Sequence, residues 1–99
     1  MIEKTFKIIN PTGLDAKMSS LLVTLSGKFT SNVLLQLNEL SVDLKSIMGV
    51  MSLNVHKGEV VRVICSGLDE EDALRELAVL INDKKLGKEY WLGVNIACF

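Results

Sequence analysis

A chain of 99 residues has room for one hydrophobic core and not for a second. Hydrophobic residues make up 48% of the chain and charged residues 23%, a globular composition that excludes intrinsic disorder. The 11 basic and 12 acidic residues are scattered, and the net charge of −1 gives no electrostatic basis for binding nucleic acid or an anionic membrane. No apolar run has the length of a signal peptide or a membrane span, so we expect a cytoplasmic protein.

Two cysteines and one histidine are too few, and too far apart, for a disulfide framework or a metal site. Cys65 lies in an apolar run and is expected to be buried, whereas Cys98 could be an exposed thiol. His56 precedes the last predicted strand and is interpreted as a solvated loop residue. We therefore expect no metal, no cofactor and no self-contained enzyme active site.

The first elements along the chain are a strand and a helix. A two-residue period over residues 2–9 places Phe6 and Ile8 on one face of a strand. A helical period follows, with Asp15 at the N-cap position and Gly27 at the stop. Its apolar stripe consists of Leu14, Met18, Leu21, Leu22 and Leu25.

A hairpin, a short helix and a fourth strand come next. Apolar residues alternate over 33–37 and again over 40–44, on either side of the turn residues Asn38 and Glu39. Ser46 is placed to cap a short helix over residues 47–53. The valine- and isoleucine-rich run 59–66 then predicts the fourth strand.

The last predicted helix begins at Asp69 as its cap, and Gly87 is placed to terminate it. The three acidic residues 70–72 lie in its first turn, where negative charge interacts favourably with the positive end of the helix dipole. The order βαββαβα predicts an α/β (α+β) fold in which an antiparallel sheet carries helices on one face.

The run Lys45-Ser46-Ile47-Met48-Gly49-Val50-Met51-Ser52-Leu53 is the most informative stretch of the sequence. Ser46 could be a plain N-cap, or it could accept a phosphate where a helix start tolerates negative charge. Helical spacing alone favours core packing for Ile47, Met48 and Met51, although flexible methionines also suit a surface that fits several partners.

This run, together with Gly13-Leu14-Asp15-Ala16 and the element order, resembles HPr, the small phosphocarrier family of the bacterial sugar phosphotransferase system. The resemblance covers residues 1–85 and leaves an apolar, aromatic C-terminal extension over residues 86–99. It implies an open-faced β-sandwich with four antiparallel strands in the order 1-4-2-3 and three helices on one face. It also implies regulatory phosphorylation of Ser46 by HPr kinase/phosphorylase.

The sequence departs from the family at its phosphocarrier motif, Gly-Ile/Leu-His-Ala-Arg-Pro. Here the stretch is Gly13-Leu14-Asp15-Ala16-Lys17-Met18, so Asp15 occupies the position of the phosphate-accepting histidine. The substitution of lysine for arginine also weakens a phosphate clamp, because lysine lacks the planar fork of donors.

Loss of the histidine with retention of the serine run resembles the HPr-like catabolite-repression proteins. That resemblance implies a regulator without histidine phosphotransfer, which docks to a LacI-type catabolite control transcription factor once Ser46 is phosphorylated. The implied docking residues are Lys17, Ser20, Leu21, Lys45, Ile47, Met48 and Met51. Asp15 is not the glutamine expected in that subfamily, and its charge would imitate a phosphorylated histidine only crudely.

Two other functions stay open. The chain could be a diverged interaction or decoy domain that occupies enzyme I or a transporter subunit, or a phosphocarrier that uses Asp15 as an aspartyl phosphate. The 86–99 extension could fold back on its own domain or anchor a partner, and the Asn10–Gly13 hinge could permit a domain-swapped homodimer.

Overall fold

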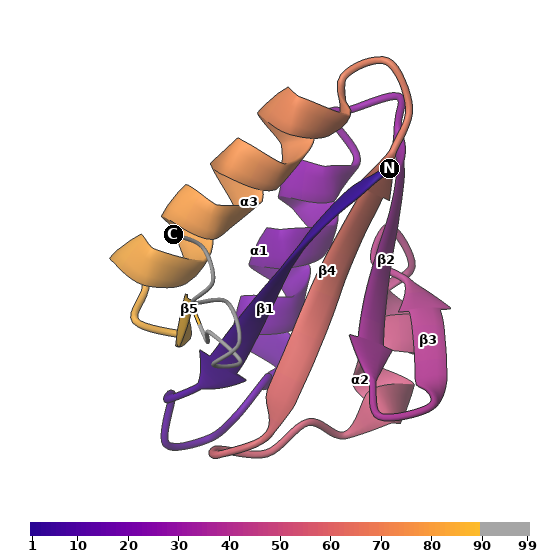
Figure 1. Cartoon of the computed structure of the whole chain (residues 1–99). Coiled ribbons are helices and arrows are strands. Elements are labelled where there is room, and N and C mark those ends of the chain that lie inside the picture. Colours follow the sequence, from indigo (N-terminus) through magenta and orange to yellow (C-terminus); the bar gives the residue numbers. More distant parts are fainter. Residues whose placement is uncertain (90–99) are drawn as a thin grey trace.

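The computed structural model describes residues 1–89, which form five strands and three helices. In chain order the elements are β1 (Ile2–Ile8), α1 (Ala16–Ser26), β2 (Asn32–Leu37), β3 (Leu40–Asp43), α2 (Ile47–Leu53), β4 (Val60–Ser66), α3 (Glu70–Asp83) and β5 (Gly87–Glu89). The strands form one antiparallel sheet in the order β3-β2-β4-β1-β5, and the helices lie together on one face of it (Figure 1). The predicted open-faced architecture is confirmed.

The predicted strand order 1-4-2-3 is present, but the prediction of four strands was wrong by one. The short strand β5 pairs with β1 at the edge of the sheet, with Gly87 opposite Ile8 and Lys88 opposite Lys7. A Cβ atom on Gly87 would lie 2.9 Å from the carbonyl oxygen of Lys7, so glycine permits this close approach. Three residues are too few to show a strand period, which explains why the sequence pattern did not predict β5.

Helix α3 ends earlier than predicted, at Asp83 instead of near Gly87. Lys85 adopts a left-handed conformation with φ of 54°, and the N–H of Leu86 donates to the carbonyl of Ile81 at 3.0 Å. This is a Schellman-type ending with lysine where glycine is preferred. Leu86 is buried and β5 follows at once, so the sheet includes residues beyond position 85; positions 90–99 of the predicted extension lie outside the described residues.

Two of the three predicted helix caps are confirmed. The Asp15 carboxylate accepts a hydrogen bond from the Met18 N–H at 2.9 Å, and the Ser46 hydroxyl accepts one from the Gly49 N–H at 3.2 Å. Asp69 makes no side-chain cap, because its carboxylate accepts instead from Thr30 and Ser31 across the α1–β2 loop. The sequence therefore predicted a polar residue at the start of α3, but it did not predict the loop residues that the Asp69 carboxylate contacts.

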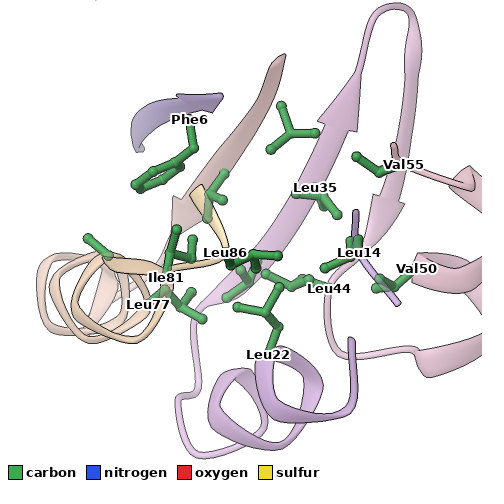
Figure 2. Packing of buried hydrophobic residues seen from close by; sticks show 14 of the residues in the cluster. Phe6, Leu14, Leu22, Leu35, Leu44, Val50, Val55, Leu77, Ile81 and Leu86 are labelled. Carbon is green, nitrogen blue, oxygen red and sulfur yellow. The ribbon is translucent and has the colours of Figure 1, made fainter. Parts of the chain in front are cut away.

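The core lies between the sheet and the helices (Figure 2). The cluster of buried side chains includes Phe6 and Leu35 from the strands, Leu22 of α1, Val50 of α2 and Leu77 of α3. Cys65 is buried, as predicted, and this burial raises the pKa of its thiol to about 11. His56 is exposed in a loop, also as predicted.

Candidate docking surface around Ser46 and Asp15

Ser46 is an exposed serine whose backbone is fixed at the start of α2. Its N–H donates to the Asp43 carbonyl at 3.0 Å, and its carbonyl accepts from the Val50 N–H at 3.0 Å. The hydroxyl oxygen caps the Gly49 N–H, where a Cβ on Gly49 would come within 3.4 Å of it. The chain therefore presents this hydroxyl to solvent in a defined position.

The apolar residues of α2 divide between core and surface. Val50 and Leu53 are buried, whereas Ile47 and Met51 are each 41% exposed and Met48 is 81% exposed. The core-packing interpretation is therefore wrong for these last three side chains. Helix α2 lies on the sheet with one side, so apolar side chains on its other sides stay in solvent. The result is an exposed apolar patch directly after Ser46.

Helices α1 and α2 pack against each other and run in opposite directions. The N–H of Leu14, just before α1, donates to the carbonyl of Val55, just after α2, at 3.0 Å. The Lys45 ammonium, just before α2, donates to the carbonyl of Phe29, just after α1, at 2.7 Å. Ser46 and Asp15 thus lie at opposite ends of a two-helix surface, separated by roughly the 10 Å length of a seven-residue helix.

Gly13 allows the loop before α1 to pack against the loop after α2. Its φ is +68°, and a Cβ at this position would lie 2.3 Å from the Val55 carbonyl oxygen and 2.9 Å from the His56 Cα. No other residue could occupy the position without moving the backbone. This contact holds Asp15 beside the end of α2.

The remaining residues of the predicted docking surface differ in how exposed they are to solvent. Lys17 and Ser20 are exposed on α1, and Leu21 is half-buried beside them. Lys45 is partly buried, and its ammonium is engaged by the Phe29 carbonyl. Its position therefore ties the end of α1 to the start of α2, a structural role that sequence spacing could not reveal.

Both carboxylate oxygens of Asp15 already accept hydrogen bonds. Oδ1 accepts from the Met18 N–H at 2.9 Å, and Oδ2 accepts from the Thr12 hydroxyl at 2.7 Å. These donors, first the Met18 N–H and then the Thr12 hydroxyl, lower the pKa of Asp15 below its ordinary value of 3.8. Stabilising the charged carboxylate in this way makes it a weaker nucleophile.

Within residues 1–89, no cluster of three or more metal-ligating side chains occurs. None of the helices in the same span is long and apolar enough to cross a membrane.

The architecture and the antiparallel packing of α1 and α2 define a small open-faced domain with Ser46 and Asp15 at the two ends of one surface. The family described as PTS HPr component phosphorylation site matches residues 2–83, and the chain belongs to this HPr family of the phosphotransferase system. Proteins of this family are phosphocarriers that interact with enzymes of the phosphotransferase system, or catabolite-repression homologues of such carriers.

Solved structures agree with this assignment. A histidine-containing phosphocarrier protein from Mycoplasma is 29% identical, with a TM-score of 0.85 over 87% of this chain and 98% of its own. HPr-C-His from Thermoanaerobacter tengcongensis is 43% identical, with a TM-score of 0.81 over 85% and 94%. Crh, the Bacillus subtilis catabolite-repression protein, is 38% identical, with a TM-score of 0.67 over 84% and 95%, and its structure is described as a domain-swapped dimer.

The substitutions in the phosphocarrier motif are structurally coupled. The Asp15 carboxylate is held by the N–H of Met18, at the position where the family motif quoted above has proline. Proline has no N–H and could not make this bond. The stretch from Gly13 to Met18 therefore forms a self-capped helix start.

Proposed function

We propose that this protein is an HPr-like regulator that is switched by phosphorylation of Ser46 and does not transfer phosphate through position 15. The observation that carries the proposal is the exposed Ser46 hydroxyl directly beside the exposed side chains of Ile47, Met48 and Met51. Exposed apolar side chains grouped beside a hydroxyl that can be modified are typical of a surface that docks to another protein.

The proposed modifying enzyme is an HPr kinase/phosphorylase in the cytoplasm. The Ser46 oxygen attacks the γ-phosphorus of ATP, the bond to the β-phosphate oxygen breaks, and ADP and the hydroxyl proton leave. The product carries about two negative charges beside the first turn of α2, where the backbone N–H groups have no intrahelical acceptors. The fold is therefore expected to tolerate the phosphate.

The proposed partner is a LacI-type catabolite control transcription factor. Phosphoserine supplies charge for its basic residues, the apolar patch after Ser46 supplies buried contact area, and Lys17 and Ser20 on α1 supply polar contacts at the edge. Lys45 contributes by holding the two helices in register through Phe29.

Transfer of phosphate through Asp15 receives no support from the geometry. Its two carboxylate oxygens are occupied by Met18 and Thr12, and its lowered pKa opposes nucleophilic attack. The neighbouring cation is Lys17, which lacks the bidentate geometry of arginine. If neither site accepts phosphate, the diverged interaction domain that occupies enzyme I or a transporter subunit becomes the better description.

Site-specific phosphorylation tests the first part of the proposal. HPr kinase with ATP should add one phosphate to the wild type and to Ser52→Ala, and none to Ser46→Ala. Ser52 is a matched control because it is exposed on the same helix, where its hydroxyl donates to the Gly49 carbonyl at 2.6 Å. Equal labelling of Ser46→Ala and the wild type would reject Ser46 as the site.

Calorimetric binding of the phosphorylated protein to the transcription factor tests the second part. Met48→Ala should weaken binding at least tenfold, because it removes the most exposed apolar side chain of α2. Val79→Ala is the control, because Val79 is an apolar residue that is 49% exposed on a different helix, α3. The affinity of this variant for the transcription factor should stay within about twofold of the wild type. Equal losses in the two variants would contradict the proposed surface.

A further inference from the structure

The sheet carries a pair of lysines at its β1–β5 edge that the docking surface does not use. Lys7 of β1 and Lys88 of β5 are direct partners in the antiparallel register, and both are exposed. Cross-strand partners have their Cβ atoms about 5 Å apart, and like charges placed there repel each other. Phe6 and Ile8, the neighbours of Lys7, point into the core, so Lys7 and Lys88 extend from the opposite, helix-free face.

A third lysine approaches the same place from the loop before β4. The Gly58 N–H donates to the Ile8 carbonyl at 2.8 Å, which holds this loop against the end of β1 and places Lys57 at the site. The three lysines line one hollow of about 580 Å³, whose other lining residues are Ile8, Ile9, Gly58 and Glu89. This volume is in the range of small-molecule sites.

The nearby carboxylates are committed to other donors. Glu89, the one acidic residue among the lining residues, pairs with Lys4 at 2.9 Å. Glu59, next to Gly58, accepts from the His56 N–H at 2.7 Å through its Oε1 atom. Three lysines therefore line one hollow whose acidic member is already paired, although the whole chain has a net charge of −1.

From this juxtaposition we infer that the hollow between β1, β5 and the Lys57–Gly58 loop is a binding site for a small oligophosphate, with Lys7, Lys57 and Lys88 as its cationic ligands. A diphosphate or triphosphate bridges the three ammonium groups and removes the repulsion between Lys7 and Lys88. A single monovalent anion would leave at least one of those charges unpaired. The site contains no residue of α1 or α2 and is therefore separate from the proposed docking surface around Ser46.

Titration of the full-length protein with sodium pyrophosphate, followed by amide NMR, tests this assignment at constant ionic strength. The expected shifts concentrate at Lys7, Lys57, Gly58 and Lys88, and tripolyphosphate should bind more tightly than pyrophosphate. Sodium sulfate serves as the reference anion, and we expect it to bind at least tenfold more weakly than pyrophosphate. Shifts distributed over lysines throughout the surface, or no saturation by millimolar pyrophosphate, would overturn the assignment.

Two charge-neutralising variants make the test specific. Lys7→Gln/Lys88→Gln should weaken pyrophosphate binding at least tenfold while keeping or raising the thermal unfolding temperature, because it removes a like-charge pair. Lys28→Gln removes an exposed lysine from the turn after α1, at the opposite end of the sheet, and should change the affinity less than twofold (Figure 1). Equal weakening by Lys28→Gln would reduce the site to a general charge effect.

Discussion

At the scale of single residues, the polar groups of this protein are matched to donors that the folded backbone supplies. The Asp69 carboxylate accepts from the N–H groups of Thr30 and Ser31, each at 2.9 Å, and from the Ser31 hydroxyl. These contacts, with the Ser31 hydroxyl foremost, lower the pKa of Asp69 from 3.8 to about 2. Asp69 thus ties the start of α3 to the loop between α1 and β2.

The pH dependence of unfolding follows from this lowered pKa. A carboxyl group whose pKa falls on folding stabilises the protein above its unfolded pKa, and that stabilisation is lost as the pH falls through the folded value. Asp69→Asn should lower the urea midpoint at pH 7, because an amide NH₂ would face a backbone donor. The midpoint difference between wild type and variant should persist down to about pH 4 and close towards pH 2. A difference of equal size at pH 7 and pH 2 would contradict this role.

Two buried serines differ in whether their hydroxyl groups have a hydrogen-bond partner. Ser26 and Ser31 are both buried, but the Ser26 hydroxyl has no hydrogen-bond partner within residues 1–89, whereas the Ser31 hydroxyl donates to Asp69. Ser26→Ala should therefore raise the free energy of unfolding by about 1 kcal/mol, because it removes an unsatisfied polar group. Ser31→Ala should lower it. Urea unfolding of the two variants, with opposite signs of the change, is the check; destabilisation by Ser26→Ala would show that its hydroxyl has a partner.

At the scale of elements, the sequence predicted the parts that have a clear period or a local cap. Alternation identified β1, β2 and β3, and a run rich in valine and isoleucine identified β4. The Asp15 and Ser46 caps identified the starts of α1 and α2. The sequence did not predict β5 or the end of α3, because three residues carry no period and Lys85 does not resemble a helix stop. The tether from Lys45 to Phe29 and the exposure of Ile47, Met48 and Met51 also depend on packing, which spacing cannot supply.

The ending of α3 leads to a second stability prediction. Lys85 holds φ of 54°, a conformation that costs most side chains about 1 kcal/mol and glycine almost nothing. Lys85→Gly should therefore raise the free energy of unfolding by about 0.5–1 kcal/mol, with part of the gain offset by the greater freedom of glycine in the unfolded chain. Lys84→Gly is the control, because Lys84 has φ of −89° and should lose stability. A loss of stability in Lys85→Gly would contradict the Schellman-type ending.

At the scale of the whole molecule, the fold separates two surfaces. The helices cover one face of the sheet and carry Ser46 with its apolar patch, whereas Lys7 and Lys88 lie on the uncovered face at the far edge (Figure 1). The proposed functions therefore place protein binding on one side of the molecule and binding of a small anion on the other. Domain swapping and dimers occur among the solved relatives, and a homodimer of this chain remains a prediction.

The central claim is that Ser46 accepts phosphate and position 15 does not. The most direct measurement is the intact mass, with site mapping, of the purified protein after two parallel reactions: HPr kinase with ATP, and enzyme I with phosphoenolpyruvate. We expect one phosphate on Ser46 from the first reaction and none from the second, under conditions where an authentic HPr accepts phosphate in both. Phosphate on Asp15 from enzyme I, or an unmodified protein in the kinase reaction, would contradict this claim.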